Sequence, residues 1–190
     1  QILKFNSMIR NENERMNKYV ERILLQAKLD RREVHLKKVP VNLNVLVDEA
    51  VEHFRLQVEE KGGVIRAELD PEGYVMSADE VHMLNVVCNL IDNAIKYSHD
   101  SLNIYIYTKQ EGNRFIIGVR DTGIGIPKEA QDKVFKRFYR VPSGNLHNVK
   151  GFGLGLSYAK SIVELHGGEI QLTSKKNKGT LVEIIFKMES

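Results

Sequence analysis

Hydrophobic residues recur at helical spacing in four parts of the chain. At its start, four of them stand seven positions apart: Ile2, Ile9, Met16 and Ile23. This repeat predicts a long helix that ends near Asp30 and whose apolar seam requires a partner. Three further patterns predict helices at 43–61, around 84–96 and after Gly155.

Alternating apolar and polar residues predict the strands. Phe115, Ile117 and Val119 alternate with their neighbours in this way. The predicted strands lie at 35–39, 64–69 and 74–76, and two hairpins cover 102–120 and 169–187. Helices on one face of a mixed sheet form a two-layer α/β sandwich, so we expect an α+β fold preceded by a long N-terminal helix.

The helix around residue 89 carries amides opposite its apolar side. Its apolar stripe consists of Leu84, Val87, Cys88, Ile91 and Ile95. Asn85, Asn89, Asn93 and Lys96 therefore share the other face. Amide oxygens can bind a hard cation and an ammonium can bind phosphate, which would make this face a magnesium and phosphate site. The alternative is the solvated polar face of an ordinary amphipathic helix.

An aspartate ends one predicted strand, and two glycines follow it. Asp121 stands after the alternating run, and Gly123 and Gly125 allow the backbone to come close to its surroundings. An aspartate at the base of an apolar slot can accept a hydrogen bond from an exocyclic amine such as that of adenine. A plain turn after a strand also uses Asp and Gly, so both interpretations stay open.

A second glycine-rich segment precedes the helix after Gly155. Gly151, Gly153 and Gly155 lie at or near the start of that helix, where backbone N–H groups can bind phosphate oxygens. The stretch before them, 127–150, is rich in charge and poor in periodicity, which is typical of a mobile lid. Such glycines also mark ordinary loops and dinucleotide sites, but the dinucleotide version opens the first strand-to-helix turn.

Together, and in this order, these segments resemble the ATP-binding catalytic domain of a bacterial sensor histidine kinase. The superfamily also contains gyrase, Hsp90 and MutL. The matching segments are NLIDNAIKYS at Asn89, DTGIGIP at Asp121, VFKRFYR at Val134, GFGLGLS at Gly151 and the pair Gly179-Thr180. The resemblance covers roughly residues 36–188 and departs from many members at Phe152, where a smaller residue is usual.

The resemblance implies how phosphates and metal would be held. Asn93 would coordinate magnesium with help from Asn89, and Lys96 would contact phosphate. Arg140 would reach the terminal phosphate when the lid closes. The phosphates would lie on the glycine-rich segment, where the implied nucleotide contacts are Gly151, Gly153, Leu154, Gly155 and Leu156.

The resemblance also implies an adenine site. Asp121 would bind the adenine amine, with Thr180 supporting it through its hydroxyl or a water. Tyr97 would line the ribose or adenine side. The remaining implied contacts are Gly123, Gly125 and Ile126. Phe135 and Phe138 would anchor the lid by packing.

The resemblance also implies which group attacks the γ-phosphate of ATP. In the ATP-hydrolysing relatives a glutamate acts as base at the place of Asn89, and an amide cannot take that proton. Attack by water should therefore be slow, and a histidine on a separate helical domain would be the acceptor. None of the six histidines has the family's Glu-x-x-x-Pro context after it: His35, His53, His82, His99, His147 and His166. We expect the acceptor upstream of Gln1, no catalytic residue of that kind in this chain, and no autophosphorylation by this chain alone.

The resemblance divides the chain into two parts. Residues 1–34 would be the second helix of a dimerisation and phosphotransfer hairpin, and residues 35–190 the ATP-binding domain with a lid at about 127–152. The implied partners are ATP, the histidine-bearing dimerisation domain, a response regulator and a second copy in the full-length homodimer. Two other classes stay open: an ATPase or conformational clamp, which the missing glutamate disfavours, and a non-catalytic nucleotide-binding module.

Composition limits the other possibilities. A chain of 190 residues with 42% apolar content can bury one core of about 150 residues besides a long helix. A net charge of +3 gives no reason to expect nucleic acid as a partner. A single cysteine, Cys88, excludes an internal disulfide and fits a reducing compartment. No apolar run is long enough to span a membrane, so we expect a cytoplasmic portion of a parent anchored upstream in the bacterial inner membrane.

Overall fold

The computed structural model describes residues 33–98, 102–141 and 152–188, together with part of the segment between residues 5 and 27. The chain forms two units, Gln1–Leu36 and Lys37–Ser190. The described residues between 5 and 27 are helical, as the repeat predicts, whereas the expected end near Asp30 lies outside the described residues. Among the residues that can be described, no helix is long and apolar enough to cross a membrane.

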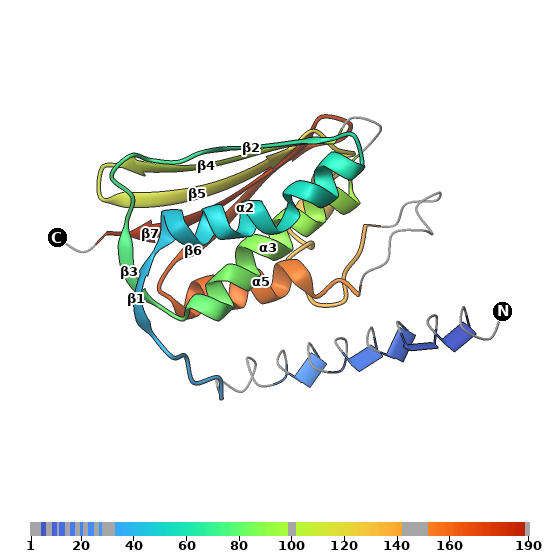
Figure 1. Cartoon of the computed structure of the whole chain (residues 1–190), viewed down its shortest axis with the longest axis horizontal. Helices are drawn as coiled ribbons and strands as arrows, with labels where there is room; N and C mark the ends of the chain where they lie inside the picture. The colour runs from blue at the N-terminus through green and yellow to red at the C-terminus, as the bar shows by residue number, and fades with distance from the viewer. Residues whose placement is uncertain are drawn as a thin grey trace. The chain divides into compact units, whose positions relative to one another are not determined.

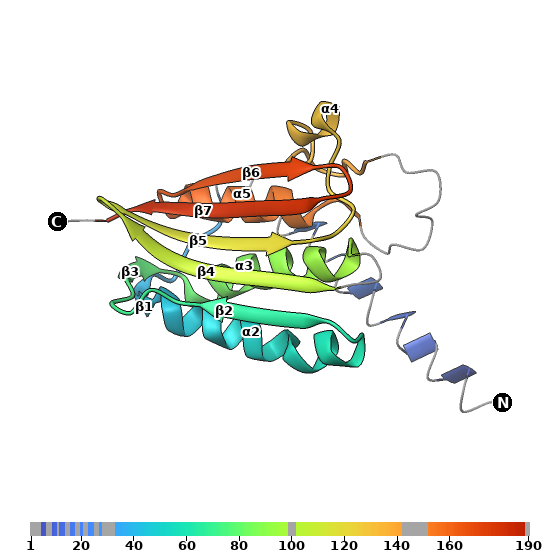
Figure 2. The ribbon, with the colours of Figure 1, turned by 90° about the horizontal axis from the view of Figure 1, so that it is seen from above.

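A mixed sheet of five strands forms one layer of the second unit (Figure 2). In spatial order its strands are β2 (Val64–Glu68), β4 (Asn103–Glu111), β5 (Arg114–Asp121), β7 (Gly179–Lys187) and β6 (Glu169–Lys175). β2 runs parallel to β4, and the other neighbouring pairs are antiparallel. Both predicted hairpins are therefore present.

Three helices cover one face of this sheet and form the second layer (Figure 1). They are α2 (Leu43–Glu60), α3 (Glu80–Lys96) and α5 (Gly155–Leu165). Side chains of Asn42 and Asp79 cap α2 and α3 by accepting N–H groups of the first turn, which explains where these helices begin. The two-layer α+β fold expected from the sequence is confirmed.

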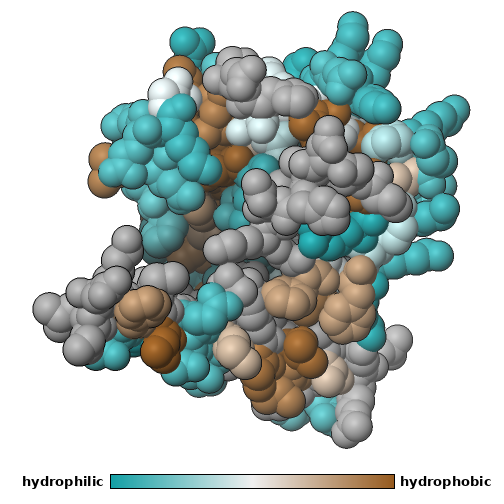
Figure 3. All heavy atoms as spheres, turned by 90° about the vertical axis from the view of Figure 1, so that its right-hand side faces the viewer, coloured by the Kyte–Doolittle hydropathy of each residue, from teal (hydrophilic) through white to brown (hydrophobic). Residues whose placement is uncertain are grey.

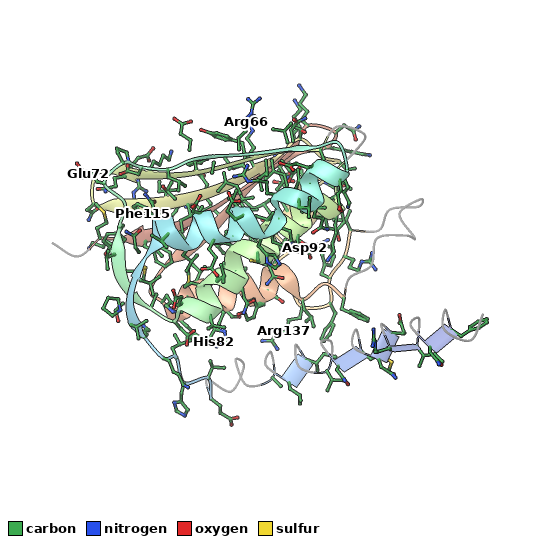
Figure 4. The ribbon with its side chains drawn as sticks, viewed as in Figure 1. Arg66, Glu72, His82, Asp92, Phe115 and Arg137 are labelled. Carbon is green, nitrogen blue, oxygen red and sulfur yellow. The ribbon has the colours of Figure 1, made fainter. Side chains whose placement is uncertain are left out.

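Alternation along β5 places its apolar side chains in the core between the layers. Phe115, Ile117 and Val119 are buried against the helices. Phe115 lies between sheet and helices, whereas Arg66 of β2 projects from the other face of the sheet (Figure 4). The core thus fixes the register of β5, and with it the position of the residue at its end, Asp121.

One predicted strand is misplaced. The strand expected at 35–39 is β1 (Val39–Asn42), and it pairs with β3 (Val75–Ala78) in a separate two-stranded sheet. Residues 33–38 form no regular element. The reason is visible at Lys37, whose N–H donates to the side chain of Asp79 instead of to a neighbouring strand.

Candidate nucleotide-binding site

Two amide side chains of α3, those of Asn89 and Asn93, are half-buried and lack a hydrogen-bond partner among the described residues. The buried side of α3 consists of Met83, Val86, Val87, Leu90, Ile91, Ala94 and Ile95. This buried side does not coincide fully with the predicted apolar stripe, because Leu84 and Cys88 of that stripe are only half-buried. Asn89 and Asn93 are also half-buried, and within the described ranges neither side chain has a hydrogen-bond partner. Buried amides are usually paired, so these two groups are suited to a ligand.

The start of α5 lies against these amides. A Cβ atom at Gly155 would be 3.5 Å from Asn89 Oδ1 and 3.7 Å from Asn93 Nδ2. Among the described residues, no side chain caps the N-terminus of α5, whose N-cap residue is Leu154. The first N–H groups of this helix carry its positive end toward the amide face of α3, as an anion site requires. The fold thus joins two segments that are more than 60 residues apart in sequence.

Asp121 holds one oxygen in place and leaves the other available. Its Oδ1 accepts the N–H of Gly123 at 2.8 Å and the N–H of Thr180 at 3.2 Å. In the described part of the chain, Oδ2 has no such partner. Burial raises the pKa of Asp121, while the two backbone N–H groups oppose that rise. The Oδ2 atom is therefore available to accept a further hydrogen bond.

The glycines beside Asp121 serve close packing. A Cβ at Gly123 would lie 2.2 Å from the carbonyl oxygen of Tyr97, the residue that ends α3. Gly125 has a positive φ of 62°, and its Cβ would lie 2.1 Å from the carbonyl oxygen of Lys175. These contacts explain the glycines by structure alone, so the evidence for a ligand lies in Asp121. They also bring Tyr97 and Ile126 to the same end of the sheet, because Ile124 N–H donates to Tyr97 O.

Sequence reasoning missed Ser174, which joins three parts of this end. Its Oγ accepts the N–H of Ile126 at 2.8 Å, donates to Gly179 O at 2.9 Å and lies 2.9 Å from Thr180 Oγ1. Thr180 thus supports Asp121 directly through its backbone N–H, and its hydroxyl is engaged by Ser174. The antiparallel register, in which Ser174 faces Thr180, is the signal that could have found it.

Lys96 has an acidic partner on its own helix. Its ammonium group donates to the carboxylate of Asp92, one turn earlier on α3. Asp92 was not singled out from the sequence, although the i, i+4 spacing could have indicated the pair. Figure 4 shows Asp92 on α3. A phosphate that takes Lys96 would therefore have to compete with this carboxylate.

The first half of the predicted lid is packed, contrary to the expectation of an irregular stretch. It contains a short helix, α4 (Lys128–Gln131), and buries Ala130 and Val134. The Gln131 amide donates to the carbonyl oxygens of Ile126 and Ser174. Sequence periodicity cannot show so short a helix, since it spans barely one turn.

The two sides of the lid meet at Phe138 and Gly153. Phe138 N–H donates to Gly153 O at 3.0 Å, and both residues have positive φ angles. Phe138 is 61% exposed, so the prediction that it anchors the lid by packing is wrong. Phe135 is half-buried, with the ammonium of Lys160 5.7 Å from its ring centre.

Three of the remaining candidates differ in exposure. Arg140 is exposed, Leu154 is buried and Leu156 is half-buried. Gly151 and residues 142–150 lie outside the described residues. Figure 3 looks onto this end, where apolar side chains lie recessed between polar ones in the upper half of the view. Asn89, Asn93, Gly155, Tyr97 and Asp121 are thus linked through the C-terminal half of α3, the start of α5 and the turn after β5.

Sequence comparison identifies related proteins. The family described as histidine kinase-, DNA gyrase B- and HSP90-like ATPase matches residues 78–190. Sensor protein RprX of Bacteroides fragilis is 41% identical over 177 residues, which is 92% of this chain and 34% of that protein. Sensor protein kinase WalK of Staphylococcus saprophyticus is 35% identical over 188 residues, 98% of this chain and 30% of that protein. The chain spans about a third of the length of these relatives.

Solved structures share the fold. Histidine kinase AdeS of Acinetobacter baumannii superposes with a TM-score of 0.78 at 24% identity, over 98% of this chain and 84% of that one. The catalytic domain of histidine kinase ThkA superposes with a TM-score of 0.69 at 26% identity, over 80% of this chain and 96% of that one.

Proposed function

The chain belongs to the family of histidine kinase-, DNA gyrase B- and HSP90-like ATPases, and on this basis we propose that it is the ATP-binding catalytic part of a sensor histidine kinase. It transfers the γ-phosphoryl group of ATP to a histidine on a dimerisation domain outside this chain. The observation that carries the proposal is the position of Gly155 at the start of α5, where a Cβ atom would lie within 4 Å of the amides of Asn89 and Asn93, which have no hydrogen-bond partner among the described residues. This proximity supports a phosphate site at the helix end, beside two amide side chains whose oxygens could bind a metal ion.

Asp121 gives the site its preference for adenine. Its Oδ1 is held by Gly123 and Thr180, which leaves Oδ2 to accept the exocyclic amine. The half-buried position makes the bond selective, because a base without that amine would leave the carboxylate unpaired. Tyr97 and Ile126 form the sides against which the base or ribose packs.

Asn89 and Asn93 fit magnesium as ligands. Both present neutral oxygen donors in half-buried positions, and a hard cation prefers oxygen. Neutral donors leave the charge of the metal to be balanced by phosphates, so metal and nucleotide should bind together. Bound there, magnesium would neutralise the charge that builds up on the transferred group.

The groups on α3 favour a kinase over an ATPase. Asn89 cannot accept a proton from water, and the carboxylate of Asp92 on the same helix is paired with Lys96. The bound nucleotide therefore waits for a better nucleophile, the imidazole of a histidine. The protein contributes positioning and charge neutralisation, which is most of what phosphoryl transfer needs.

The N-terminal unit fits the dimerisation hairpin. Ile9, Met16 and Ile23 follow the seven-residue repeat and are each about half exposed or more, from 45% to 59%. We propose that residues 1–34 are the second helix of the hairpin, that residues 35–190 are the catalytic domain with a lid at 127–152, and that the full-length protein is a homodimer. A response regulator then receives the phosphoryl group. The portion described would lie in the cytoplasm, with its parent anchored in the bacterial inner membrane.

The variant Asn93→Asp tests the metal role. It replaces a neutral ligand by a charged one beside the phosphates, so transfer of labelled phosphate from ATP to a supplied histidine-bearing hairpin should fall at least about a hundredfold. Asn85→Asp is the control, because Asn85 is exposed on the same helix and should leave transfer unchanged. Circular dichroism should show that both variants are folded. Unchanged transfer by Asn93→Asp would remove this residue from the magnesium role.

A further inference from the structure

One carboxylate connects α3 to the segment that enters the catalytic unit. Asp79 is buried, and its Oδ1 accepts the N–H of His82 at 3.1 Å, as a helix N-cap does. Its Oδ2 accepts the N–H of Lys37 at 2.8 Å. A helix cap needs only the first of these bonds. The second holds the backbone of Lys37, which is the first residue of the second unit.

The same residue is bonded to the end of α5. The N–H of Asp79 donates to Nε2 of His166 at 2.9 Å, and Nδ1 of His166 lies 2.8 Å from Ile162 O. With Nε2 as acceptor, Nδ1 carries the proton and the ring is neutral, which agrees with the burial that lowers the pKa of His166. The ammonium of Lys38 lies 3.4 Å from Leu165 O and forms a second, exposed link.

α5 therefore contacts both the nucleotide site and the entry segment. It begins at Gly155, against Asn89 and Asn93, and ends at Leu165, next to His166. Eleven residues of helix make a rigid element about 16 Å long. Residues 37–38 are bonded to its far end through Asp79 and Lys38.

We propose that Asp79 is a positioning residue for phosphoryl transfer, which fixes the direction in which the chain enters the catalytic unit at Lys37. The inference rests on the proposed function. Transfer to a histidine joined through residues 1–36 depends on how often that histidine meets the γ-phosphate, which a freer joint would reduce. The bond from Lys37 N–H to Asp79 Oδ2 restricts the joint, and His166 ties it to the helix that holds the phosphates.

The variant Asp79→Asn removes this bond selectively. Its amide oxygen can still accept the N–H of His82, while its NH₂ group faces the N–H of Lys37 and cannot accept it. In a longer protein that carries the histidine upstream, we expect transfer to fall about three- to tenfold, the effect of one hydrogen bond. Nucleotide affinity and transfer to a separately supplied hairpin should stay unchanged.

Two further variants provide an independent test of the same bond and a matched control. Lys37→Pro deletes the donor and leaves Asp79 and the cap of α3 intact, so it should reproduce the loss even if Asp79→Asn folds poorly. Asp70→Asn is the matched control, because Asp70 also accepts backbone N–H groups, but from Glu72, Gly73 and Gln110. It should change stability without changing transfer.

The outcomes separate this proposal from the proposed function. Unchanged transfer to the joined histidine in Asp79→Asn and Lys37→Pro would overturn the positioning role. An equal loss with joined and separate hairpins would overturn it too, since that pattern indicates general damage to the catalytic unit. A wild-type chain that binds no ATP would instead contradict the proposed function.

Discussion

Asp121 keeps an acceptor oxygen half-buried at the end of β5. Burying this group lowers the stability of the folded chain at neutral pH before any nucleotide binds. Burial raises its pKa above the ordinary value of 3.8. A carboxyl group with a raised pKa stabilises the folded state fully only when the pH is below its ordinary pKa. This stabilisation is lost as the pH rises through the pKa of the folded state. At neutral pH the charge on Asp121 therefore works against folding, which is typical of residues that serve a ligand.

Asp121→Asn should separate function from stability. The amide oxygen can still accept the N–H groups of Gly123 and Thr180, so the turn is kept and the buried charge is removed. We expect thermal unfolding at neutral pH to be unchanged or to move to higher temperature. Calorimetry should show adenine nucleotide affinity reduced at least about a hundredfold. A variant that is destabilised yet binds ATP normally would assign Asp121 to the turn alone.

Single residues differ in how far their roles could be predicted from the sequence. Asn89, Asn93 and Asp121 could be selected because their segments together, and in this order, resemble a known family, although each pattern alone also fits an ordinary helix face or turn. Ser174 could not, since a serine in a strand is common and its role depends on the register with Thr180. The bond from Asp79 to Lys37 could not be predicted either, because it joins residues 42 positions apart without any repeating pattern.

At the scale of elements, glycines serve two purposes. Some allow backbone segments to pack closely, and others would keep space free for a ligand. Gly179 has a φ of 96°, and a Cβ there would lie 1.9 Å from the carbonyl oxygen of Asp121. Gly155 stands at the start of α5, and a Cβ there would make only ordinary contacts with Asn89 and Asn93. The sheet needs a glycine at the first position, and we propose that the second leaves room for the nucleotide.

Gly179→Ala and Gly155→Ala should therefore have opposite effects. Gly179→Ala should lower the free energy of unfolding in urea by about 3 kcal/mol, because backbone must move away from backbone. Gly155→Ala should keep stability or raise it by up to about 1 kcal/mol, since alanine favours a helix. Its methyl group should nevertheless weaken nucleotide binding measured by calorimetry. Full affinity in Gly155→Ala would show that phosphates do not reach the start of α5.

Elements with several turns or several alternating positions could be predicted, and short ones could not. α2, α3 and the two hairpins follow from periodicity. β1 was displaced because a side chain, Asp79, takes the N–H of Lys37. α4 was missed because its four residues are too few to show a period.

At the scale of the whole molecule, we assign only one of the two reacting groups, ATP, to the catalytic unit. It offers a helix end, amide oxygens and a carboxylate for ATP, and we assign the attacking histidine to another domain. The relatives are about three times as long as this chain, so they have room for such a domain. α5 lies beside Asn89 and Asn93 at one end and is bonded to the entry segment at the other, as the proposed positioning role requires.

Titration calorimetry of the chain with ATP, with and without magnesium, tests the central claim most directly. We expect one saturable site per chain that binds more tightly with magnesium, because Asn89 and Asn93 present neutral oxygens that need the metal to hold phosphates. GTP, which has no amine at the position that Asp121 would read, should bind much more weakly. A folded chain that takes up no adenine nucleotide, whichever metal is supplied, would contradict the account.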